Sequence, residues 1–225
     1  VLFIFIIGSV LFLPMLLVPL QLQQISGYSP IDTGYLLLSR GVGSVIGFTV
    51  LSRFRDRWDP RPVLLFGLLG TGWASWSMAQ WTVDIRAIDV IWTNLLHGIA
   101  TAAIWAPLNT LTLSKISKRI QDQAFAFFYL AFDIGSAIGT AIVISLHARY
   151  SQINQSILTE HITNFDTPIP LPSQWSVANI EGIASLNREV IRQATMIAFN
   201  ESFMIVAIVL FSLIPCILFF KPHRG

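Results

Sequence analysis

The chain has 225 residues, of which 54% are hydrophobic and only 12% are charged. Soluble domains carry roughly 25% charged residues, so this composition excludes an ordinary soluble protein and indicates an integral membrane protein. The formal net charge of +2 does not indicate nucleic-acid binding, because the basic residues lie mostly between apolar stretches, and the single cysteine, Cys216, excludes an intrachain disulfide.

Six apolar stretches have about the length, ~20 residues, that a helix needs to cross a bilayer. In chain order they cover about 1–20, 33–51, 63–81, 88–113, 124–146 and 195–220. We therefore predict an all-α, polytopic membrane protein with six spans. The chain begins at Val1, already inside the first stretch, and no basic region precedes it. We expect the sequence to be a fragment that lacks an upstream part.

The basic residues of the connections predict the orientation of the spans. Nine lie in the connections on one side of the membrane: Arg53, Arg55, Arg57, Arg61, Lys115, Lys118, Arg119, Lys221 and Arg224. Four lie on the other side: Arg86, Arg149, Arg188 and Arg192. Cytoplasmic loops carry the excess of Lys and Arg. We therefore expect both chain ends, including a tail at 221–225, in the cytoplasm, and the loop 147–194 on the outside.

The loop 147–194 contains two amphipathic segments, separated by the prolines of TPIPLP at 167–172. Proline lacks the amide proton that a helix interior needs, so this segment interrupts any helix. Two interpretations fit the pattern: a solvated cap that lies on the membrane surface, or a docking surface for a partner protein.

Two stretches repeat each other on the second and fifth predicted spans. RGVGSVIG at 40–47 and FDIGSAIG at 132–139 share a GSxIG core, 92 residues apart (43 to 135). The two spans cross in opposite directions, which is typical of the inverted repeats of many secondary transporters. Four glycines of these cores also have GxxxG spacing, which lets helices approach closely in lipid: Gly43, Gly47, Gly135 and Gly139.

Four polar residues within the spans are candidates for a substrate cavity or for coupling: Asp133, Arg40, His97 and Asn94. Asp133 is the tenth residue of its span and lies roughly 15 Å deep. An ionisable group at the bilayer centre costs ~2.5–3.5 kcal/mol on insertion scales and normally faces a cavity or a partner. A cavity position and an ion pair with Arg40 both fit Asp133. His97 fits a functional position or a ring bonded to a backbone carbonyl, and Glu201 is expected near the outer interface.

The segment 13–61, which includes LPMLLVPLQLQQISGYSPIDTGYLLLSRGVGSVIG and SRFRDRWDPR, resembles the fourteen-span drug:proton antiporters of the major facilitator superfamily, the EmrB/QacA type. IWAPLNTLTLS at 104–114 resembles the proline-containing fourth helix of that family's C-terminal half. NQSILTEHITNF at 154–165 resembles its last outer loop. The resemblance implies a six-helix bundle that forms the C-terminal half of a major facilitator fold, an inverted 3+3 repeat, with the N-terminal half missing.

The family's cytoplasmic signature GxxxDRxGRR occurs here in altered form. Asp56 and Arg57 match its Asp-Arg pair, whereas Ser52 replaces a glycine and Asp59-Pro60 replaces the Gly-Arg part. The resemblance implies a cytoplasmic gate formed by Arg53, Asp56, Arg57 and Arg61; a positive-inside anchor is the alternative. Relatives commonly carry Arg-Asn where this chain has Phe132-Asp133, so the resemblance does not support a role for Asp133.

The resemblance also implies a proton-coupled secondary active exporter of amphipathic, drug-like compounds in the bacterial inner membrane. Its expected partners are membrane lipid, the small-molecule substrate, protons and, through the long outer loop, a periplasmic adaptor protein. No nucleic acid, cofactor, metal site or catalytic residue is expected. Aromatic residues of the fourth and fifth spans either line a cavity or pack: Trp92, Trp105, Phe125, Phe128 and Tyr129.

Two other functions fit six spans. One is a channel or a non-transporting membrane sensor on the same scaffold. The other is an intramembrane hydrolase, for which a nucleophile with a base or a set of metal ligands must converge. The sequence has no HExxH motif, and Ser44 and Ser136 lie in GSxIG settings that do not match a nucleophile motif.

Overall fold

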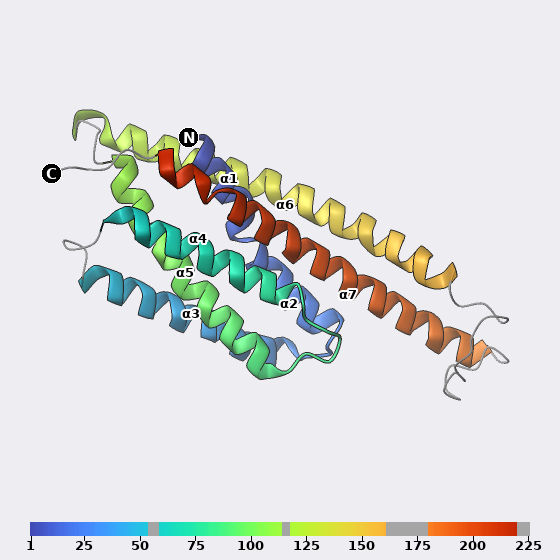
Figure 1. Ribbon diagram of the computed structural model, residues 1–225. Helices are drawn as coiled ribbons and strands as arrows, with labels where there is room; N and C mark the ends of the chain where they lie inside the picture. The colour runs from blue at the N-terminus through green and yellow to red at the C-terminus, as the bar shows by residue number, and fades with distance from the viewer. Residues whose placement is uncertain (54–58, 114–117, 161–179, 220–225) are drawn as a thin grey trace.

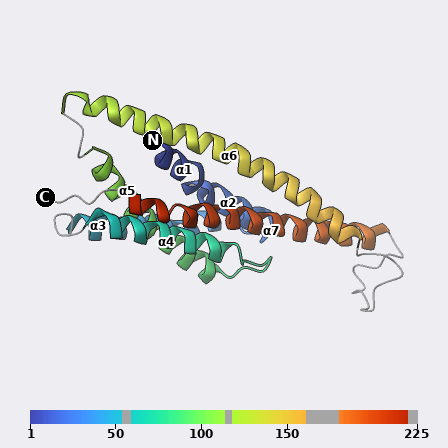
Figure 2. The ribbon, with the colours of Figure 1, turned by 45° about the horizontal axis from the view of Figure 1, so that its top comes forward.

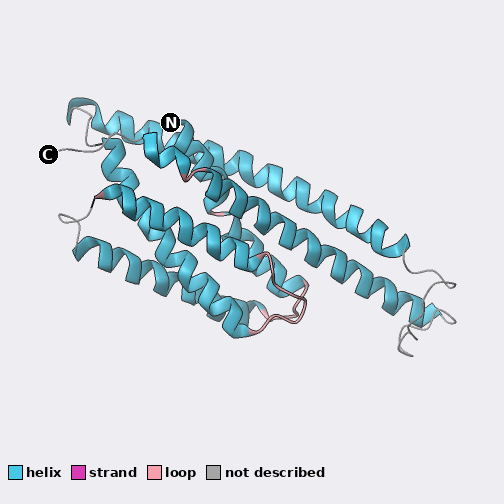
Figure 3. Cartoon of the chain, in the orientation of Figure 1, coloured by secondary structure: helices cyan, strands magenta, loops and turns pink. Residues whose placement is uncertain are grey.

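The computed structural model describes residues 1–53, 59–113, 118–160 and 180–219, and the regular structure of these residues is helical throughout (Figure 3). Its helices are α1 (Leu2–Leu11), α2 (Leu13–Gln24), α3 (Pro30–Arg53), α4 (Pro60–Met78), α5 (Ala87–Leu113), α6 (Gln121–Glu160) and α7 (Ile180–Ser212), with short 3-10 helices at Lys118–Ile120 and Pro215–Phe219. Within the described ranges, five stretches are long and apolar enough to cross a membrane, α1 and α2 forming one of them. The predicted all-α, polytopic fold is confirmed.

The helices form an elongated antiparallel bundle (Figure 1). α3 and α4 each pack on α5, α1 packs on α6, and α7 packs on both α6 and α4. The C-terminal ends of α3, α5 and α7 lie at the same end of the bundle as the start of α1, which is the pattern of alternate crossings that the sequence predicts. The turned view separates α6 from α4 and α5, with α1 and α2 beside it (Figure 2).

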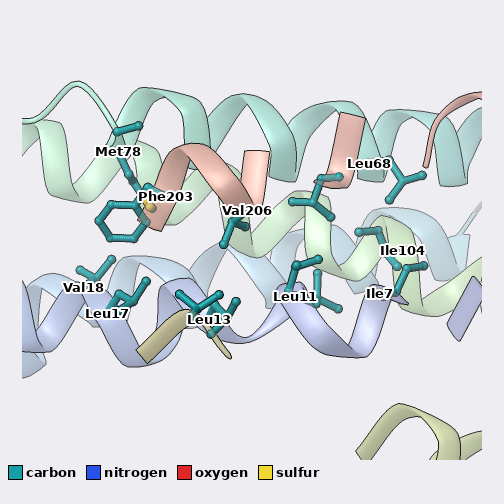
Figure 4. Close-up of a cluster of buried hydrophobic side chains, with 14 of the residues drawn as sticks. Ile7, Leu11, Leu13, Leu17, Val18, Leu68, Met78, Ile104, Phe203 and Val206 are labelled. Atoms are coloured by element: carbon teal, nitrogen blue, oxygen red, sulfur yellow. The ribbon is translucent and has the colours of Figure 1, made fainter. Parts of the chain in front are cut away.

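α1 and α2 supply much of the apolar core. Their side chains meet those of α4, α5 and α7 in one cluster of fully buried residues (Figure 4). Large members of this cluster are Ile7, Leu11, Leu13, Leu17, Leu68, Met78, Ile104, Phe203 and Val206. Leu and Ile side chains lose no hydrogen bonds on burial, so they can fill the interior of the bundle.

The first predicted span, 1–20, is two helices instead of one. α1 ends at Leu11 and α2 begins at Leu13, with Phe12 between them. Pro14 stands in the first turn of α2 and Pro19 inside it. Proline removes an intrahelical donor and its ring crowds the preceding turn, so the helix breaks at Phe12, two residues before Pro14.

α4 is the least apolar of the predicted spans and is not among the five that the hydropathy supports. It has 19 residues, and Thr, Gly and Ser occupy much of its second half. These small side chains pack against α5 and α7: Gly67 meets Ile104 and Gly72 meets the ring of Phe211. Helix packing therefore compensates for the low hydropathy of this segment.

The helices of the last two predicted spans, 124–146 and 195–220, extend beyond the predicted bounds toward the connection between them. α6 continues to Glu160 and α7 already begins at Ile180. The sequence from 147 to 160 contains no proline or glycine, so nothing stops a helix that has left the apolar layer. Residues 147–160 and 180–194 thus continue α6 and α7 and are not separate amphipathic helices, while the TPIPLP segment lies outside the described residues.

Side chains hold the extended parts of α6 and α7 together. The ring centroids of His147 and Phe199 lie 4.3 Å apart, and the hydroxyls of Ser151 and Thr195 lie 3.2 Å apart. The amide of Asn154 donates to Glu201 over 3.2 Å. α7 ends at Ser212, two residues before a 3-10 turn that starts at Pro215, because that proline cannot continue the ladder of amide donors.

Candidate functional site

Small residues bring α3 and α5 into backbone contact. A Cβ atom added to Gly98 would overlap the carbonyl oxygen of Arg40, and one added to Gly43 would overlap that of Leu95. A Cβ on Gly47 would come within 2.9 Å of the carbonyl oxygen of Ile99. Only glycine fits these positions, so the GxxxG spacing on α3 serves the close approach that the sequence predicts.

The crossing of α1 and α6 has the same construction. A Cβ on Gly8 would overlap the carbonyl oxygen of Phe132, and Cβ atoms on Gly135 and Gly139 would overlap those of Phe5 and Ser9. Every glycine contact at this crossing therefore has a counterpart at the other crossing.

The residue numbers relate the two crossings one to one. Gly98 of α5 corresponds to Gly8 of α1, a separation of 90, and the same separation relates Leu95 to Phe5 and Ile99 to Ser9. The contacts on α3 and α6 are related by the separation of 92 found in the sequence, so that Arg40 corresponds to Phe132. Because α1–α6 and α5–α3 are equivalent pairs, the predicted inverted repeat is confirmed.

A polar cluster lies where α3 crosses α5. Arg40 of α3 donates from Nη2 to Oδ1 of Asn94 over 2.6 Å, and Asn94 donates from Nδ2 to the carbonyl oxygen of Val90 over 2.8 Å. Asn94 is fully buried. Gly43 of α3 and Gly98 of α5 bring the two helices close enough for a side chain of α3 to reach an amide of α5.

His97 lies one helical turn after Asn94 and is buried. The Thr101 hydroxyl donates to the carbonyl oxygen of His97 over 2.7 Å, and its oxygen lies 3.3 Å from Nδ1 of the ring. A neutral ring with its proton on Nδ1 would donate to this hydroxyl oxygen and would present the lone pair of Nε2.

Two buried atoms of the cluster have no hydrogen-bond partner in the described chain: Nε of Arg40, a donor, and Nε2 of His97, an acceptor. Both residues lie at the crossing of α3 and α5, where Gly98, next to His97, contacts the carbonyl oxygen of Arg40. Buried polar atoms are nearly always paired. Arg40 can therefore still bind an acceptor, and the Nε2 lone pair of a His97 ring in this tautomer can bind a donor.

Asp133 does not join this cluster. It lies on α6 with its side chain exposed, while the adjacent Phe132 is buried against α1. Among the described residues, the side-chain ion pairs are Arg86–Asp89 and Arg192–Glu189, so the suggested ion pair of Asp133 with Arg40 is not formed there. Of the four candidates, Arg40, Asn94 and His97 come together and Asp133 stays apart.

Four of the five expected aromatic residues gather between α5 and α6. Trp105 stacks with Tyr129 at 6.3 Å, and Tyr129 stacks with Phe125 at 6.1 Å and meets Phe128 edge-on at 5.5 Å. Phe132 and Phe12 complete this group, 4.9 Å and 6.5 Å from Trp105. We refer to these six residues as the aromatic cluster. Phe12 was not predicted, because its position depends on the break between α1 and α2.

Trp92, the fifth expected aromatic residue, lies elsewhere. It lines a polar pocket of about 390 Å³ where α4 ends and α5 begins, together with Trp81 and the ion pair of Arg86 with Asp89. The hydrogen bond and charge of Asp89 raise the pKa of Arg86 above its usual range, so the pocket contains a charged and paired guanidinium.

The expected gate residues are described in part. Asp56 and Arg57 lie outside the described residues, Arg53 is the last residue of α3, and Arg61 follows the start of α4. The Asp59 carboxylate caps α4 by accepting from the amide of Arg61 over 3.0 Å. Proline is favoured at the first position of a helix and aspartate just before it, so Asp59-Pro60 replaces the family's Gly-Arg with a helix start.

Crossing helix pairs related by an inverted repeat, with a polar cluster buried at one crossing, define a polytopic membrane protein with secondary-transporter architecture. Residues 1–159 match the model of the Major Facilitator Superfamily. The chain belongs to this superfamily.

Curated relatives match nearly the whole chain. The "Multidrug export protein EmrB" of Haemophilus influenzae is 24% identical over 99% of this chain and 44% of its own length. The "Fatty acid resistance protein FarB" of Neisseria gonorrhoeae is 24% identical over 93% of this chain and 42% of its length. The Escherichia coli "Multidrug export protein EmrB" is 23% identical over 97% and 43%. The chain thus spans less than half the length of these relatives.

Proposed function

We propose that the chain forms one half of a secondary active exporter, which moves amphipathic, drug-like compounds out of the cell in exchange for protons. The observation that carries this proposal is the pair of equivalent glycine crossings. Alternating access requires bundles that move as rigid bodies around a fixed site, and backbone contact at both crossings makes such a bundle stiff. The export and resistance named for the relatives support the substrate class.

The aromatic cluster is the proposed wall of the substrate path. Tyr129 and Phe12 are 42% and 41% exposed, so the cluster presents ring faces outside the packed core. Aromatic faces attract organic cations that come within ~6 Å of the ring. Asp133 follows Phe132 on the same helix and offers the negative charge that an amphipathic cation needs.

The polar cluster is the proposed coupling element. A proton on Nε2 of His97 would place a second positive charge next to Arg40 and oppose the contact of Arg40 with Asn94. Proton binding would thereby favour a conformation in which α3 and α5 are arranged differently, which is how a ligand biases two states. A carboxylate from the other half, or from an acidic substrate, would act in the opposite direction.

Placement in the inner membrane is part of the same proposal. The helix ends that carry Arg53, Arg61 and Arg119 would face the cytoplasm. The extended parts of α6 and α7 would then project outward, where a periplasmic adaptor would find a helical surface.

The test uses full-length protein in liposomes with an imposed pH gradient and ethidium as the transported cation. We expect gradient-driven ethidium transport, and we expect His97→Gln to abolish the response to the gradient while leaving ethidium exchange at equal pH. His147→Gln is the matched control, because His147 is only half-buried and lies between α6 and α7. Saturable transport that ignores the gradient would contradict coupling. Ion conductance without transport would indicate a channel, and no flux at all a sensor.

A further inference from the structure

An apolar groove of about 610 Å³ runs between α3 and α4, near the ends of these helices that carry arginines. Its walls and floor include Gly47, Val50, Val63, Phe66, Ile99 and Ala103. This volume falls within the ~300–1,000 Å³ that is usual for sites of small ligands. The described helices do not enclose the groove, so an occupant can enter from outside this bundle.

Packing on α5 creates the groove. Gly47 lets α3 approach Ile99 and Ala102, and Gly67 lets α4 approach Ala103 and Ile104. Both helices therefore pack closely on the small residues of α5, yet α3 and α4 hardly contact each other. The channel between them has an apolar floor and two apolar walls, and no side chain of the described chain fills it.

The groove has a charged end. Arg53 stands one helical turn beyond Val50 on α3, and Arg61 immediately precedes the wall residues of α4. Nη2 of Arg61 is buried without a hydrogen-bond partner in the described residues. Asp59 also lines the groove, but one of its carboxylate oxygens caps α4. Among the described residues, this end of the groove therefore has two arginines near one carboxylate, and one arginine donor without a partner.

We propose that this groove binds an acyl chain of an anionic phospholipid of the cytoplasmic leaflet, with the lipid phosphate held by Arg53 and Arg61. The apolar walls match the chain, and the guanidinium groups match the phosphate, to which arginine binds through paired donors. Basic residues at this level of a bilayer select anionic lipids. The inference rests on the proposed orientation, which places this end of the bundle in the cytoplasm.

The test measures lipid retention instead of transport, so its failure is distinguishable from failure of the exporter function. Full-length protein is purified in detergent, titrated with palmitoyl-oleoyl phosphatidylglycerol or phosphatidylethanolamine, and examined by native mass spectrometry. We expect one phosphatidylglycerol to remain bound at collision energies that remove phosphatidylethanolamine. Arg53→Gln with Arg61→Gln should lower that preference at least fivefold.

A second variant tests the apolar part. Val50→Trp fills the groove and should release both lipids, whereas Val45→Trp, on an exposed position of α3 outside the groove, should not. Arg119→Gln is the control for the arginine pair, because Arg119 is exposed and belongs to a different connection. Equal retention of the two lipids by the native protein, or an arginine pair that behaves like Arg119→Gln, would overturn the proposal. If Val50→Trp does not fold, the arginine pair decides the outcome.

Discussion

Asn94 is the hydrogen-bond partner of the Arg40 guanidinium inside the bundle. Its amide is fully buried, accepts from Arg40 at 2.6 Å and donates to the carbonyl oxygen of Val90. Both polar groups of the amide are therefore used, one for each helix. Removing the amide leaves a charged donor without its partner, which costs more than the hydrogen bond itself contributes.

We therefore expect Asn94→Leu to destabilise the full-length protein by about 1–2 kcal/mol. The measurement is thermal unfolding of purified protein in detergent. Ser39→Ala serves as the control, because the Ser39 hydroxyl bonds only within its own helix. Adding Arg40→Leu to Asn94→Leu should recover part of the loss, since the unpaired charge is then gone. Equal melting temperatures of Asn94→Leu and Ser39→Ala would refute the interhelical role.

Asp133 gives the second prediction at this scale. Its exposed carboxylate makes no ion pair in the described chain, so Asp133→Asn should fold as stably as the native protein. Export of ethidium should fall at least tenfold, while export of an uncharged substrate changes less than twofold, because only the cation uses the negative charge. Asp122→Asn, at the exposed start of the same helix, controls for surface charge. Unchanged export of both compounds would remove Asp133 from the site.

At the scale of the helices, the glycines differ according to their neighbours. Gly43 faces the backbone of α5, whereas Gly41, two residues earlier on α3, has no atom within 4 Å of its added Cβ. Gly43 therefore allows helix contact, whereas Gly41 only continues the helix.

Gly43→Ala should destabilise the bundle by about 1–3 kcal/mol, because the methyl group forces α3 away from α5. Gly41→Ala should be neutral or stabilising by up to about 1 kcal/mol, since alanine has the higher helix propensity. Thermal unfolding of the two variants in parallel decides the matter. A crossing that does not need close approach would give both variants the same melting temperature.

At the scale of the whole molecule, α6 is longer than the hydrocarbon core of a bilayer is thick. α6 has 40 residues, which is about 60 Å at 1.5 Å per residue, against a hydrocarbon core of ~30 Å. Since α6 starts at the end of the bundle that carries the arginines, the surplus length projects at the opposite end (Figure 1).

This shape gives a topology prediction for the intact cell. In a Cys216→Ser background, Ser156→Cys should react with an impermeant thiol reagent applied outside, and Asp122→Cys should react only after the membrane is permeabilised. Both positions are exposed and lie at opposite ends of α6, so accessibility to the reagent differs only by the side of the membrane. The reverse labelling pattern would invert the proposed orientation, and with it the leaflet assigned to the lipid groove.

Much of this architecture is readable from local sequence. Hydropathy suffices for the all-α, polytopic fold, and the GSxIG cores identify the repeat, because each pattern depends on residues close together along the chain. The orientation drawn from the basic residues stays a prediction. Helix ends were less predictable: α6 passes residue 146 without a break because leaving the apolar layer does not end a helix. Pro14 accounts for the division between α1 and α2, and Pro215 accounts for the end of α7.

The partners of the polar residues were decided only by tertiary structure. By sequence, Asp133 is as suitable a partner for Arg40 as Asn94 is, but contact depends on which helices cross and on their rotation. Gly43 and Gly98 place Arg40 beside α5, and the repeat places the equivalent face of α6 against α1. The groove between α3 and α4 arises in the same way: its residues come from three helices, and only their joint packing on the small side chains of α5 leaves a space between them.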